Sequence, residues 1–552
     1  MSRLATATST ETPTAQSHLQ SKADTHEEPG PLWISVLVAL LCGITLAWPF
    51  RDLDSSFPAW LALAPIFRIA VFSKTRSRVF ICSMAFSLTW TWLSFDFLWN
   101  QTPPGAIALC MYTSLVYSLG LLLIRRFARK LVEHGRIFKA VFAVAAIWSL
   151  VEIARSCIPI LQFPWLLLGH TLLYNDHVRQ GADLMGVYGL SFLIAATNAA
   201  FAFAIPVIRE KRCARISVGI VAAAMAALYI YGEIRIAQIA PLLKPGRLIG
   251  VVQGNTVQKL GRSAEELTAQ LQEHLNLHRE LAEKTKASSE DTAAFICWAE
   301  TMVPGIINED GWGRAFKAGV AASGIPTLTG VNYQMARDPA KPEEIRYQNG
   351  CMLFDANGHE LFHYCKRRLV PFGEYVPFAQ FPIFNLIRSV TRDQYVPGTE
   401  ASPVYKIGGY AIALNICVED IHADLAREAA WNGADTLINV TNDGWFYRTY
   451  GPRSHLQAAA WRSIEVRRPM LRVTNTGRTV SVNPLGEIDN IIPEATKGTC
   501  LCSILRIMEG PTAAQPKTLT MYLGEGGDAV IFGMILVLCV WPLRSVKVEK
   551  IA

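Results

Sequence analysis

Charged residues are scarce over residues 31–240 of this chain and again in a short run near its C-terminus. Hydrophobic residues make up 51% of the 552 positions, charged residues make up 18%, and the mean hydropathy is +0.24. A composition this apolar excludes an ordinary soluble protein, and the length allows at least two domains. Because residues 241–526 have a normal globular composition, we expect a membrane part and a globular part.

Two further absences concern the N-terminus. Residues 1–30 contain no aromatic residue, and such a polar segment cannot bury enough surface to offset its ordering entropy, so we predict a disordered tail. No cleavage site of small residues ends the apolar run at 31–50, which therefore does not have the pattern of a signal peptide. We expect this run to remain as the first membrane span.

The sequence also lacks cysteine and histidine residues at the spacings typical of metal ligands. Cys500 and Cys502 have no histidine nearby, and His422 and His455 are not spaced as ligands. These spacings exclude the familiar zinc patterns, so we predict neither a metal nor a cofactor. We interpret the two histidines as surface or structural residues.

Apolar runs of about 20 residues, the length that crosses roughly 30 Å of hydrocarbon, recur along the chain. We predict eight spans, at residues 31–50, 56–73, 79–99, 104–124, 138–157, 186–208, 215–235 and 527–543. Lysines and arginines cluster in short loops between them, so the net charge of +7 indicates a positive-inside bias rather than binding of nucleic acid.

Alternating these spans from a cytoplasmic N-terminus places four cationic clusters on one side of the membrane, at residues 74–78, 125–139, 209–215 and 544–550. The chain then divides into a tail at 1–30, a transmembrane domain of seven helices at 31–240, a globular domain at 241–526, and a last helix with a cytoplasmic tail at 527–552. In a bacterium, the globular domain would lie on the periplasmic face of the inner membrane, and both termini would be cytoplasmic.

The segment at 158–185 is neither clearly spanning nor clearly polar. Pro164 breaks helices, and Trp165 prefers a membrane interface. We expect a surface-lying or re-entrant stretch; the alternative is that it forms part of a lipid access site.

After Arg247 the pattern changes to short β-rich runs that alternate with amphipathic stretches, which predicts an α/β layer fold. Hairpin turns are expected at 357–358 and 484–486, and helices at 263–283 and 455–467. Six of the twelve cysteines fall in this region. Cys351 and Cys365 lie almost symmetrically about the first turn, so a disulfide between them stays an open alternative in an oxidising compartment.

Glu300, Lys366 and Cys417 each lie in a strand-like, apolar-flanked block. Together they supply a base, a cation for an oxyanion and a thiol nucleophile. Cys417 ends an apolar strand just before a helical run at 423–432, whose N-terminus favours a thiolate. A structural role stays open for each residue alone: a small buried cysteine, a lysine in a solvated basic patch, and a carboxylate that caps a helix at 301–306.

The flanking motifs resemble the nitrilase, or carbon–nitrogen hydrolase, superfamily. They are WAET at 298–301, KRRLVPFGEY at 366–375, CVED at 417–420 and NDGWF at 442–446. The resemblance covers almost all of 247–505 and implies a nitrilase-like αββα sandwich with Glu300, Lys366 and Cys417 as a catalytic triad. With the predicted spans, the expected fold is an α-helical membrane domain of about eight helices plus this α/β sandwich.

More specifically, the chain resembles the apolipoprotein N-acyltransferase family, the integral-membrane branch of that superfamily. The motifs are FPWLLLG at 163–169, VQGN at 252–255, LVPFGEYVPF at 369–378 and GPRSHLQAAAWRSIEVRRPMLRVTNTG at 451–477. The resemblance implies transfer of an acyl chain from a membrane phospholipid, through a cysteine thioester, to the α-amine of S-diacylglyceryl-cysteine at an apolipoprotein's N-terminus. The implied partners are the lipid bilayer, a phospholipid donor and a diacylated apolipoprotein acceptor, and we expect a monomer.

In that ping-pong scheme Cys417 attacks the ester, Glu300 takes and returns protons, and Lys366 stabilises first the thiolate and then the oxyanion. We expect Glu374 to orient Lys366 or the incoming amine. Glu419 is expected to support the site beside the nucleophile.

The entrance expected for the site combines an apolar segment with two departures from the family pattern. Residues 378–390 are more apolar than a solvated loop, so they form either a packed loop or a lid that dips into the bilayer. Val418 stands where an aromatic commonly follows the nucleophile in the family, and Arg262 lies near a position where the family often has Trp. The residues expected at the entrance or lid are Trp165, Arg262, Phe378, Phe381, Phe384 and Val418.

Two other functions remain as alternatives. One is a membrane-tethered amidase of the nitrilase type that hydrolyses a C–N bond, although a tether needs only one span. The other is a non-catalytic scaffold or lipid-binding module, against which the complete Glu300, Lys366 and Cys417 trio argues.

Overall fold

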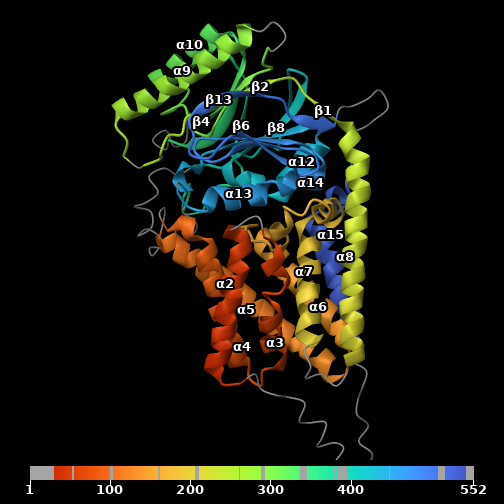
Figure 1. The fold of residues 1–552 in the computed structure, drawn as a ribbon. Coiled ribbons are helices and arrows are strands. Elements are labelled where there is room, and N and C mark those ends of the chain that lie inside the picture. Colours follow the sequence, from red (N-terminus) through yellow and green to blue (C-terminus); the bar gives the residue numbers. More distant parts are fainter. Residues whose placement is uncertain are drawn as a thin grey trace, which may run out of the picture.

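Figure 1 shows the computed structural model, in which an upright bundle of helices carries a layered α/β part at one end. The structure describes residues 30–51, 55–99, 103–159, 162–204, 211–259, 261–287, 292–335, 345–371, 373–376, 381, 395–446, 448–507 and 516–541. The tail expected at 1–30 falls outside these residues, except for Gly30. The division into a helical part and an α/β part follows the expectation.

Helices of the bundle occupy the positions of the expected spans. They are α2 (Leu32–Arg51), α3 (Ala64–Phe72), α4 (Arg76–Ser94), α5 (Pro103–Glu133), α6 (Ile137–Cys157), α7 (Ala182–Ala204), α8 (Lys211–Ile239) and α15 (Leu519–Val540). Within the described residues, six helices are long and apolar enough to cross a membrane, against the eight predicted. The exceptions are the stretch Phe57–Phe72, which is too short, and α4, which begins with charged residues and is rich in Ser and Thr. The last helix, α15, is kinked at Gly524, and its part after the kink begins close to the predicted 527.

One end of the bundle is rich in cations. Arg129 of α5 donates to the carbonyl of Ser73 at 2.7 Å, and Lys139 of α6 donates to the carbonyl of Leu538 at 3.2 Å. These bonds bring together the α3–α4 connection, the end of α5, the start of α6 and the end of α15. Two of the predicted cationic clusters, at 74–78 and 125–139, therefore lie at one end of the bundle, where α15 also ends.

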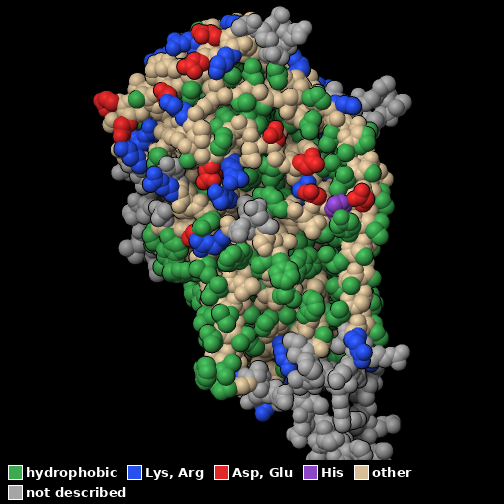
Figure 2. All heavy atoms as spheres, in the orientation of Figure 1, with side chains coloured by type: hydrophobic (Ala, Val, Ile, Leu, Met, Phe, Trp, Pro, Cys, Tyr) green, Lys and Arg blue, Asp and Glu red, His purple; other side chains and the backbone are tan. Residues whose placement is uncertain are grey.

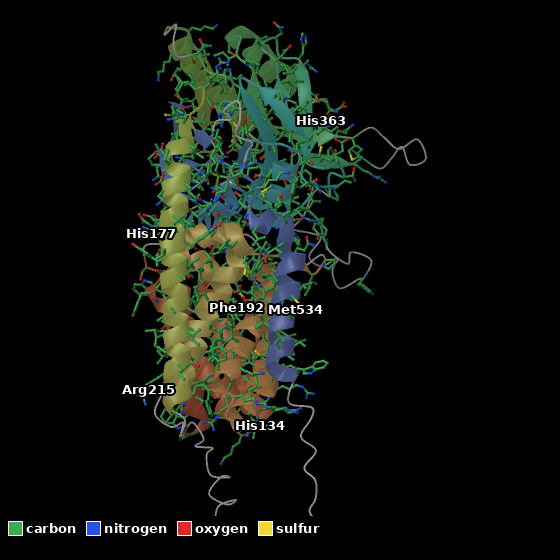
Figure 3. All side chains as sticks on the ribbon, turned by 90° about the vertical axis from the view of Figure 1, so that its right-hand side faces the viewer. His134, His177, Phe192, Arg215, His363 and Met534 are labelled. Carbon is green, nitrogen blue, oxygen red and sulfur yellow. The ribbon has the colours of Figure 1, made fainter. Side chains whose placement is uncertain are left out.

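A third predicted cationic cluster, which includes Arg215, lies at the same end, and the fourth, at 544–550, falls outside the described residues. Figure 3 shows Arg215 and His134 at the end of the bundle away from the α/β part, which carries His363. On the face drawn in Figure 2, hydrophobic side chains cover the bundle between that end and the charged surface of the α/β part. This is the distribution expected of a helical domain surrounded by lipid.

Between α6 and α7 the chain folds back into the molecule. The two short 3-10 helices there are η3 (Leu168–Leu172) and η4 (Val178–Gly181), and their residues are buried. Glu152 of α6 accepts a bond from the backbone N–H of Leu168 at 2.8 Å, and Arg155 donates to the carbonyl of Phe163 at 3.0 Å. The two charges inside this span therefore hold the expected re-entrant segment in place.

The α/β part is a four-layer sandwich. One sheet has the strand order β13-β2-β3-β4-β5-β6 and the other has the order β12-β11-β10-β9-β8-β7. The bounds of the first are β2 (Ile249–Gln253), β3 (Ile296–Trp298), β4 (Thr327–Gln334), β5 (Tyr347–Phe354), β6 (Glu360–Cys365) and β13 (Gly498–Cys502). Those of the second are β7 (Val404–Ile407), β8 (Tyr410–Ile416), β9 (Thr436–Thr441), β10 (Met470–Thr474), β11 (Thr479–Val482) and β12 (Ile488–Ile492). A separate two-stranded sheet pairs β1 (Leu243–Pro245) with β14 (Leu505–Ile507).

Helices cover the outer face of each sheet (Figure 1). They are α9 (Ala264–Ala287) and α10 (Gly311–Ser323) on the first sheet, and α12 (Ala423–Trp431), α13 (Gly451–Ala459) and α14 (Trp461–Val466) on the second. The second helical layer lies between its sheet and the membrane bundle. The expected αββα sandwich is confirmed, and it stands with one helical layer on the bundle.

The hydrophobic cores reflect this stacking. One buried cluster lies between the two sheets and includes Trp298 and Ile416. Another joins the bundle to the second helical layer, since it contains Trp90 and Trp148 of the bundle together with Trp461 of α14. The two parts of the chain therefore share a continuous apolar interior.

The expected turn at 357–358 connects β5 and β6, but Cys351 and Cys365 do not meet across it. Cys351 pairs with Tyr364, and Cys365 pairs with Gly350. Successive residues of a strand point to opposite faces of a sheet, so this register separates the two thiols. Both cysteines are free, and the disulfide alternative is wrong for this structure.

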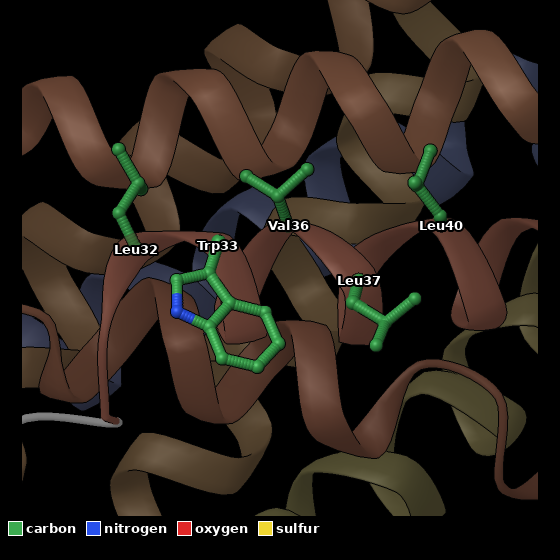
Figure 4. Close-up of a pocket in the computed structure, with 5 residues that line it drawn as sticks. All are labelled: Leu32, Trp33, Val36, Leu37 and Leu40. Atoms are coloured by element: carbon green, nitrogen blue, oxygen red, sulfur yellow. The ribbon is translucent and has the colours of Figure 1, made fainter.

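An apolar groove of about 560 Å³ runs along α2 (Figure 4). Its lining consists of Leu32, Trp33, Val36, Leu37 and Leu40. The groove lies at the cationic end, because Arg78 donates to the hydroxyl of Ser35 at 2.8 Å. It is remote from the α/β part, and its purely apolar lining suits contact with acyl chains of the bilayer.

Candidate active site

Glu300, Lys366 and Cys417 all follow the ends of strands. Glu300 comes two residues after β3 and Lys366 directly after β6, in one sheet, whereas Cys417 directly follows β8 of the other sheet. Because the two sheets face each other across a shared core, their strand ends meet. Lys366 Nζ lies 3.5 Å from Glu300 Oε1, and charge interactions connect both groups to the Cys417 thiol. The fold thus brings together three residues that are distant in sequence.

The backbone at Cys417 is left-handed, with φ of +54°. This residue joins β8 to the 3-10 helix η6 (Cys417–Ile421). A non-glycine residue in this conformation costs on the order of 1–3 kcal/mol and persists where its surroundings hold it. Asn439 Nδ2 donates to the Cys417 carbonyl at 2.9 Å. The sharp turn places Cys417 at the end of β8, where 9% of its surface is exposed.

Glu300 is buried, with 5% of its surface exposed, and both of its oxygens are bonded. Oε1 accepts from Asn349 Nδ2 at 2.7 Å, and Oε2 accepts from the backbone N–H of Asn442 at 2.9 Å. A Cβ atom at Gly330 would come within 2.4 Å of the Glu300 Cα. Only glycine at that position of β4 lets the two backbones approach, so the carboxylate is held firmly.

Lys366 is fully buried and has two carboxylate neighbours. Its Nζ lies 2.9 Å from Glu374 Oε1, closer than to Glu300. Glu374 also accepts from Asn349 Nδ2 at 2.9 Å and from the backbone N–H of Val370 at 2.8 Å. The geometry supports the expectation that Glu374 orients Lys366.

Glu419 connects the turn of the nucleophile to the segment that follows Lys366. It accepts from the backbone N–H of Ile416 at 2.8 Å and of Arg367 at 2.7 Å. The Tyr364 hydroxyl lies 3.0 Å from both of its oxygens. Burial raises the pKa of the Glu419 carboxyl, whereas these backbone donors oppose that rise. This arrangement supports the predicted role beside Cys417.

The charges around the thiol determine its resting state. Burial, followed by the charge of Glu300, raises the pKa of Cys417 well above its ordinary value, and Lys366 only partly opposes this. Burial by itself lowers the pKa of Lys366, but Glu374, Cys417 and Glu300 together raise it well above its ordinary value. Both shifts favour the protonated form of each group, so ionisation of the Cys417 thiol calls for a neighbouring base.

The expected entrance residues outside the predicted lid are Trp165, Arg262 and Val418, and they differ in burial and in their contacts. Trp165 is buried, with 1% of its surface exposed, and its indole N–H donates to Ser454 Oγ at 2.7 Å. It therefore belongs to the contact between the two parts of the chain and not to an open surface. Arg262 is half-buried and donates to the carbonyl of Glu266 at 3.1 Å, at the start of α9. Val418 is half-buried and touches both hydrophobic cores.

Of the predicted lid, the structure describes Phe381, whose side chain is 53% exposed. Phe378 and Phe384 lie outside the described residues.

Sequence reasoning missed the amides that bond Glu300, Glu374 and the backbone of Cys417. Asn349 lies within β5, Asn439 lies within β9, and Asn442 follows β9 directly. The available signal was an amide inside or at the end of an otherwise apolar strand, where a buried polar group requires a partner. Within the described residues, no group of three or more His, Cys, Asp or Glu side chains is arranged to hold a metal ion.

The chain is similar to known proteins over most of its length. Residues 42–200 match the family described as the apolipoprotein N-acyltransferase N-terminal domain, and residues 248–509 match the carbon–nitrogen hydrolase family. The apolipoprotein N-acyltransferase of Azotobacter vinelandii is 31% identical over 74% of this chain and 74% of its own length. That of Geobacter metallireducens is 27% identical over 83% and 87%, and that of Bordetella bronchiseptica is 27% identical over 92% and 97%.

Among solved structures, an amidase of the nitrilase superfamily from Nesterenkonia AN1 aligns with 47% of this chain and 91% of its own. The sequence identity is 16% and the TM-score is 0.35, values too low to bear on the function.

Proposed function

Because this chain belongs to the apolipoprotein N-acyltransferase family, we propose that it transfers an acyl chain from a membrane phospholipid to the N-terminal α-amine of S-diacylglyceryl-cysteine in apolipoproteins. The observation that carries this proposal is the buried cluster of Glu300, Lys366 and Cys417, set in a sandwich whose inner helical layer rests on an apolar helical bundle. The cluster suits acyl transfer, and the bundle gives it access to lipid.

In the first half-reaction Glu300 removes the proton of Cys417, and the thiolate attacks the ester carbonyl of the phospholipid. Lys366 lies between the two carboxylates and stabilises the tetrahedral oxyanion that forms. When the C–O bond breaks, Glu300 gives the proton to the departing oxygen. The products are a Cys417 thioester and a lysophospholipid.

In the second half-reaction the α-amine of the diacylated lipoprotein attacks the thioester carbonyl. Glu300 accepts a proton from the amine, and Lys366 again stabilises the oxyanion. The C–S bond breaks, the thiol regains its proton, and the amide product leaves. Donor and acceptor use the same thiol in turn, which makes the scheme ping-pong.

The proposed location is the inner membrane of a bacterium, with the α/β part at 241–526 on the periplasmic face. The gathering of Arg129, Lys139 and Arg215 at the far end of the bundle supports a cytoplasmic position for that end. We place the boundaries of the seven-helix membrane domain at 31–240 and those of the last helix and tail at 527–552, just after the kink of α15 at Gly524. Phe381, together with Phe378 and Phe384, is proposed to lie in a lid over the acyl chain, and Arg262 and Val418 beside the entrance.

The test is to incubate the purified protein with phospholipid vesicles alone and to measure its intact mass. We expect one acyl adduct, mapped to Cys417, that is absent in Cys417→Ala and retained in Cys365→Ala, a matched change at a partly exposed thiol. A diacylated acceptor peptide then discharges the adduct and gains its mass. Absence of an adduct with every phospholipid tested contradicts the proposal, and an adduct that only water clears indicates a hydrolase.

A further inference from the structure

His455 of α13 lies between two carboxylates, all of them fully buried. Its Nε2 is 2.9 Å from Asp420 Oδ1 and its Nδ1 is 3.0 Å from Asp443 Oδ1. Arg472 of β10 reaches the same two residues, with Nε 3.1 Å from Asp420 Oδ2 and Nη1 3.1 Å from Asp443 Oδ2. The four side chains form one closed charge cluster.

This cluster connects the two segments that hold the catalytic groups. Asp420 belongs to η6, the turn that begins with Cys417. Asp443 directly follows Asn442, whose backbone N–H bonds Glu300 at 2.9 Å. A shift of His455 therefore alters the position of the nucleophile relative to its base.

The charge count favours a protonated ring. Asp420 and Asp443 bring two negative charges and Arg472 brings one positive charge, so a neutral His455 leaves one buried charge uncompensated. Arg472 Nη2 lies 2.7 Å from His455 Nδ1 and opposes protonation. Burial also lowers the pKa of His455, yet Asp420 and Asp443 raise it above its ordinary value overall. The pKa of Asp443 falls to about 2, because Arg472 and His455 outweigh its burial.

Other buried histidines of the α/β part behave in the opposite way. Burial lowers the pKa of His278 and of His422 to about 4, and it lowers that of His274 as well. None of these rings lies between two carboxylates. The distinctive feature of His455 is its pair of acidic partners and not its burial.

The membrane part closes the remaining face of the ring. The Trp165 ring lies 5.1 Å from that of His455, and its N–H bonds the neighbouring Ser454. An indole beside a cation stabilises the charged form and excludes water. The re-entrant segment thereby contacts the cluster directly.

We propose that His455 is a positioning residue that remains an imidazolium and, by donating to Asp420 and Asp443 together, fixes the turn of Cys417 relative to the segment that anchors Glu300. This inference rests on the proposed function only for its kinetic readout.

The charge state is tested on the unmodified protein with [15N]histidine labelling. At about pH 8.5, well above the ordinary histidine pKa of about 6.5, one of the 11 histidines should keep protons on both ring nitrogens. The signal should be lost in His455→Gln and remain in His363→Gln, the same change at an exposed edge strand. A neutral ring at every histidine overturns the proposal, whatever the activity.

The positioning role is tested by the rate of Cys417 acylation from phospholipid. His455→Gln should slow acylation on the order of 10- to 100-fold, as expected for a misplaced reacting group, with the KM for phospholipid nearly unchanged. His455→Lys, which keeps the positive charge, should recover more of the rate than the variant with Gln, although Gln is closer in volume. Equal rates in His455→Gln and wild type overturn the inference, whereas absence of any adduct in wild type overturns the proposed function instead.

Discussion

The side-chain amide of Asn349 donates to Glu300, with Nδ2 2.7 Å from Oε1. The same nitrogen lies 2.9 Å from Glu374 Oε1, so one amide joins the base to the partner of Lys366. Two carboxylates that share a donor and an ammonium can both remain near the thiol without strong mutual repulsion.

Asn349→Asp should therefore disable the site. The change replaces the shared donor by a third carboxylate around Lys366, and we expect Cys417 acylation to fall on the order of 100-fold or more. The measurement is the rate of adduct formation by intact mass. Asn357→Asp, which adds the same charge at the exposed hairpin turn, serves as the control. Comparable rates in the two variants would show that the amide is dispensable.

The pH dependence of Cys417 alkylation should respond in opposite directions to its charged neighbours. Because the pKa of the thiol is raised, wild-type alkylation should require alkaline pH. Lys366→Met removes the cation that lowers this pKa and should move the profile to higher pH. Glu374→Gln removes a carboxylate that raises it and should move the profile to lower pH.

Iodoacetamide labelling followed by peptide mass mapping measures that profile. Cys365, whose pKa burial raises to about 11, is the internal control, and its profile should not move in either variant. A downward shift in Lys366→Met would contradict the assignment of Lys366 as the cation beside the thiol.

Glu419 should matter more for stability than the hydroxyl that it binds. Glu419→Ala leaves the backbone donors of Ile416 and Arg367 buried and unpaired, at about 1–3 kcal/mol for each group. Tyr364→Phe removes one bond to a charged group, which costs about 1.5–3 kcal/mol. Thermal unfolding in detergent should therefore show the larger loss for Glu419→Ala. Glu360→Ala at an exposed position is the control, and a midpoint for Glu419→Ala equal to that control would refute this account.

The orientation in the membrane is checked by thiol accessibility. In spheroplasts, a membrane-impermeant maleimide should label His363→Cys and should leave Arg215→Cys unlabelled until the membrane is permeabilised. Mass mapping of the labelled peptides separates these sites from the native cysteines. The reverse pattern would place the α/β part in the cytoplasm.

The sequence was sufficient for the strands that lead to the three candidate catalytic residues, but not for the outer strands β7 and β13. Glu300, Lys366 and Cys417 each lie at the end of an apolar strand, and the alternation of the sequence marks such ends directly. It was insufficient for Asn349 and His455, because their roles come from contacts between segments far apart in the chain. His455 in particular has no sequence signal that separates a surface ring from one enclosed by Asp420, Asp443 and Arg472.

Helices occupy the positions of the predicted spans, although within the described residues six of them, and not eight, are long and apolar enough by themselves to cross a membrane. The helix α4 is one that falls short, but it packs against α2 and α5. A helix packed in this way tolerates the Ser and Thr residues that lower its hydropathy. Glu152 and Arg155, two charged residues inside the predicted span at 138–157, are likewise bonded by the segment that follows it, at Leu168 and Phe163.

The apolar interior that runs from Trp148 of the bundle to Trp461 of α14 also limits how this protein can be divided. A fragment cut at the end of α8 would expose the side of α12 and α14 that faces the bundle, where Ala429, Trp461 and Ile464 are buried. It would also leave Glu465 of α14 without the backbone N–H of Val187 that it accepts from. Such a fragment should aggregate rather than behave as a soluble enzyme. For expression, truncation or grafting, the unit of folding is the bundle and the sandwich together.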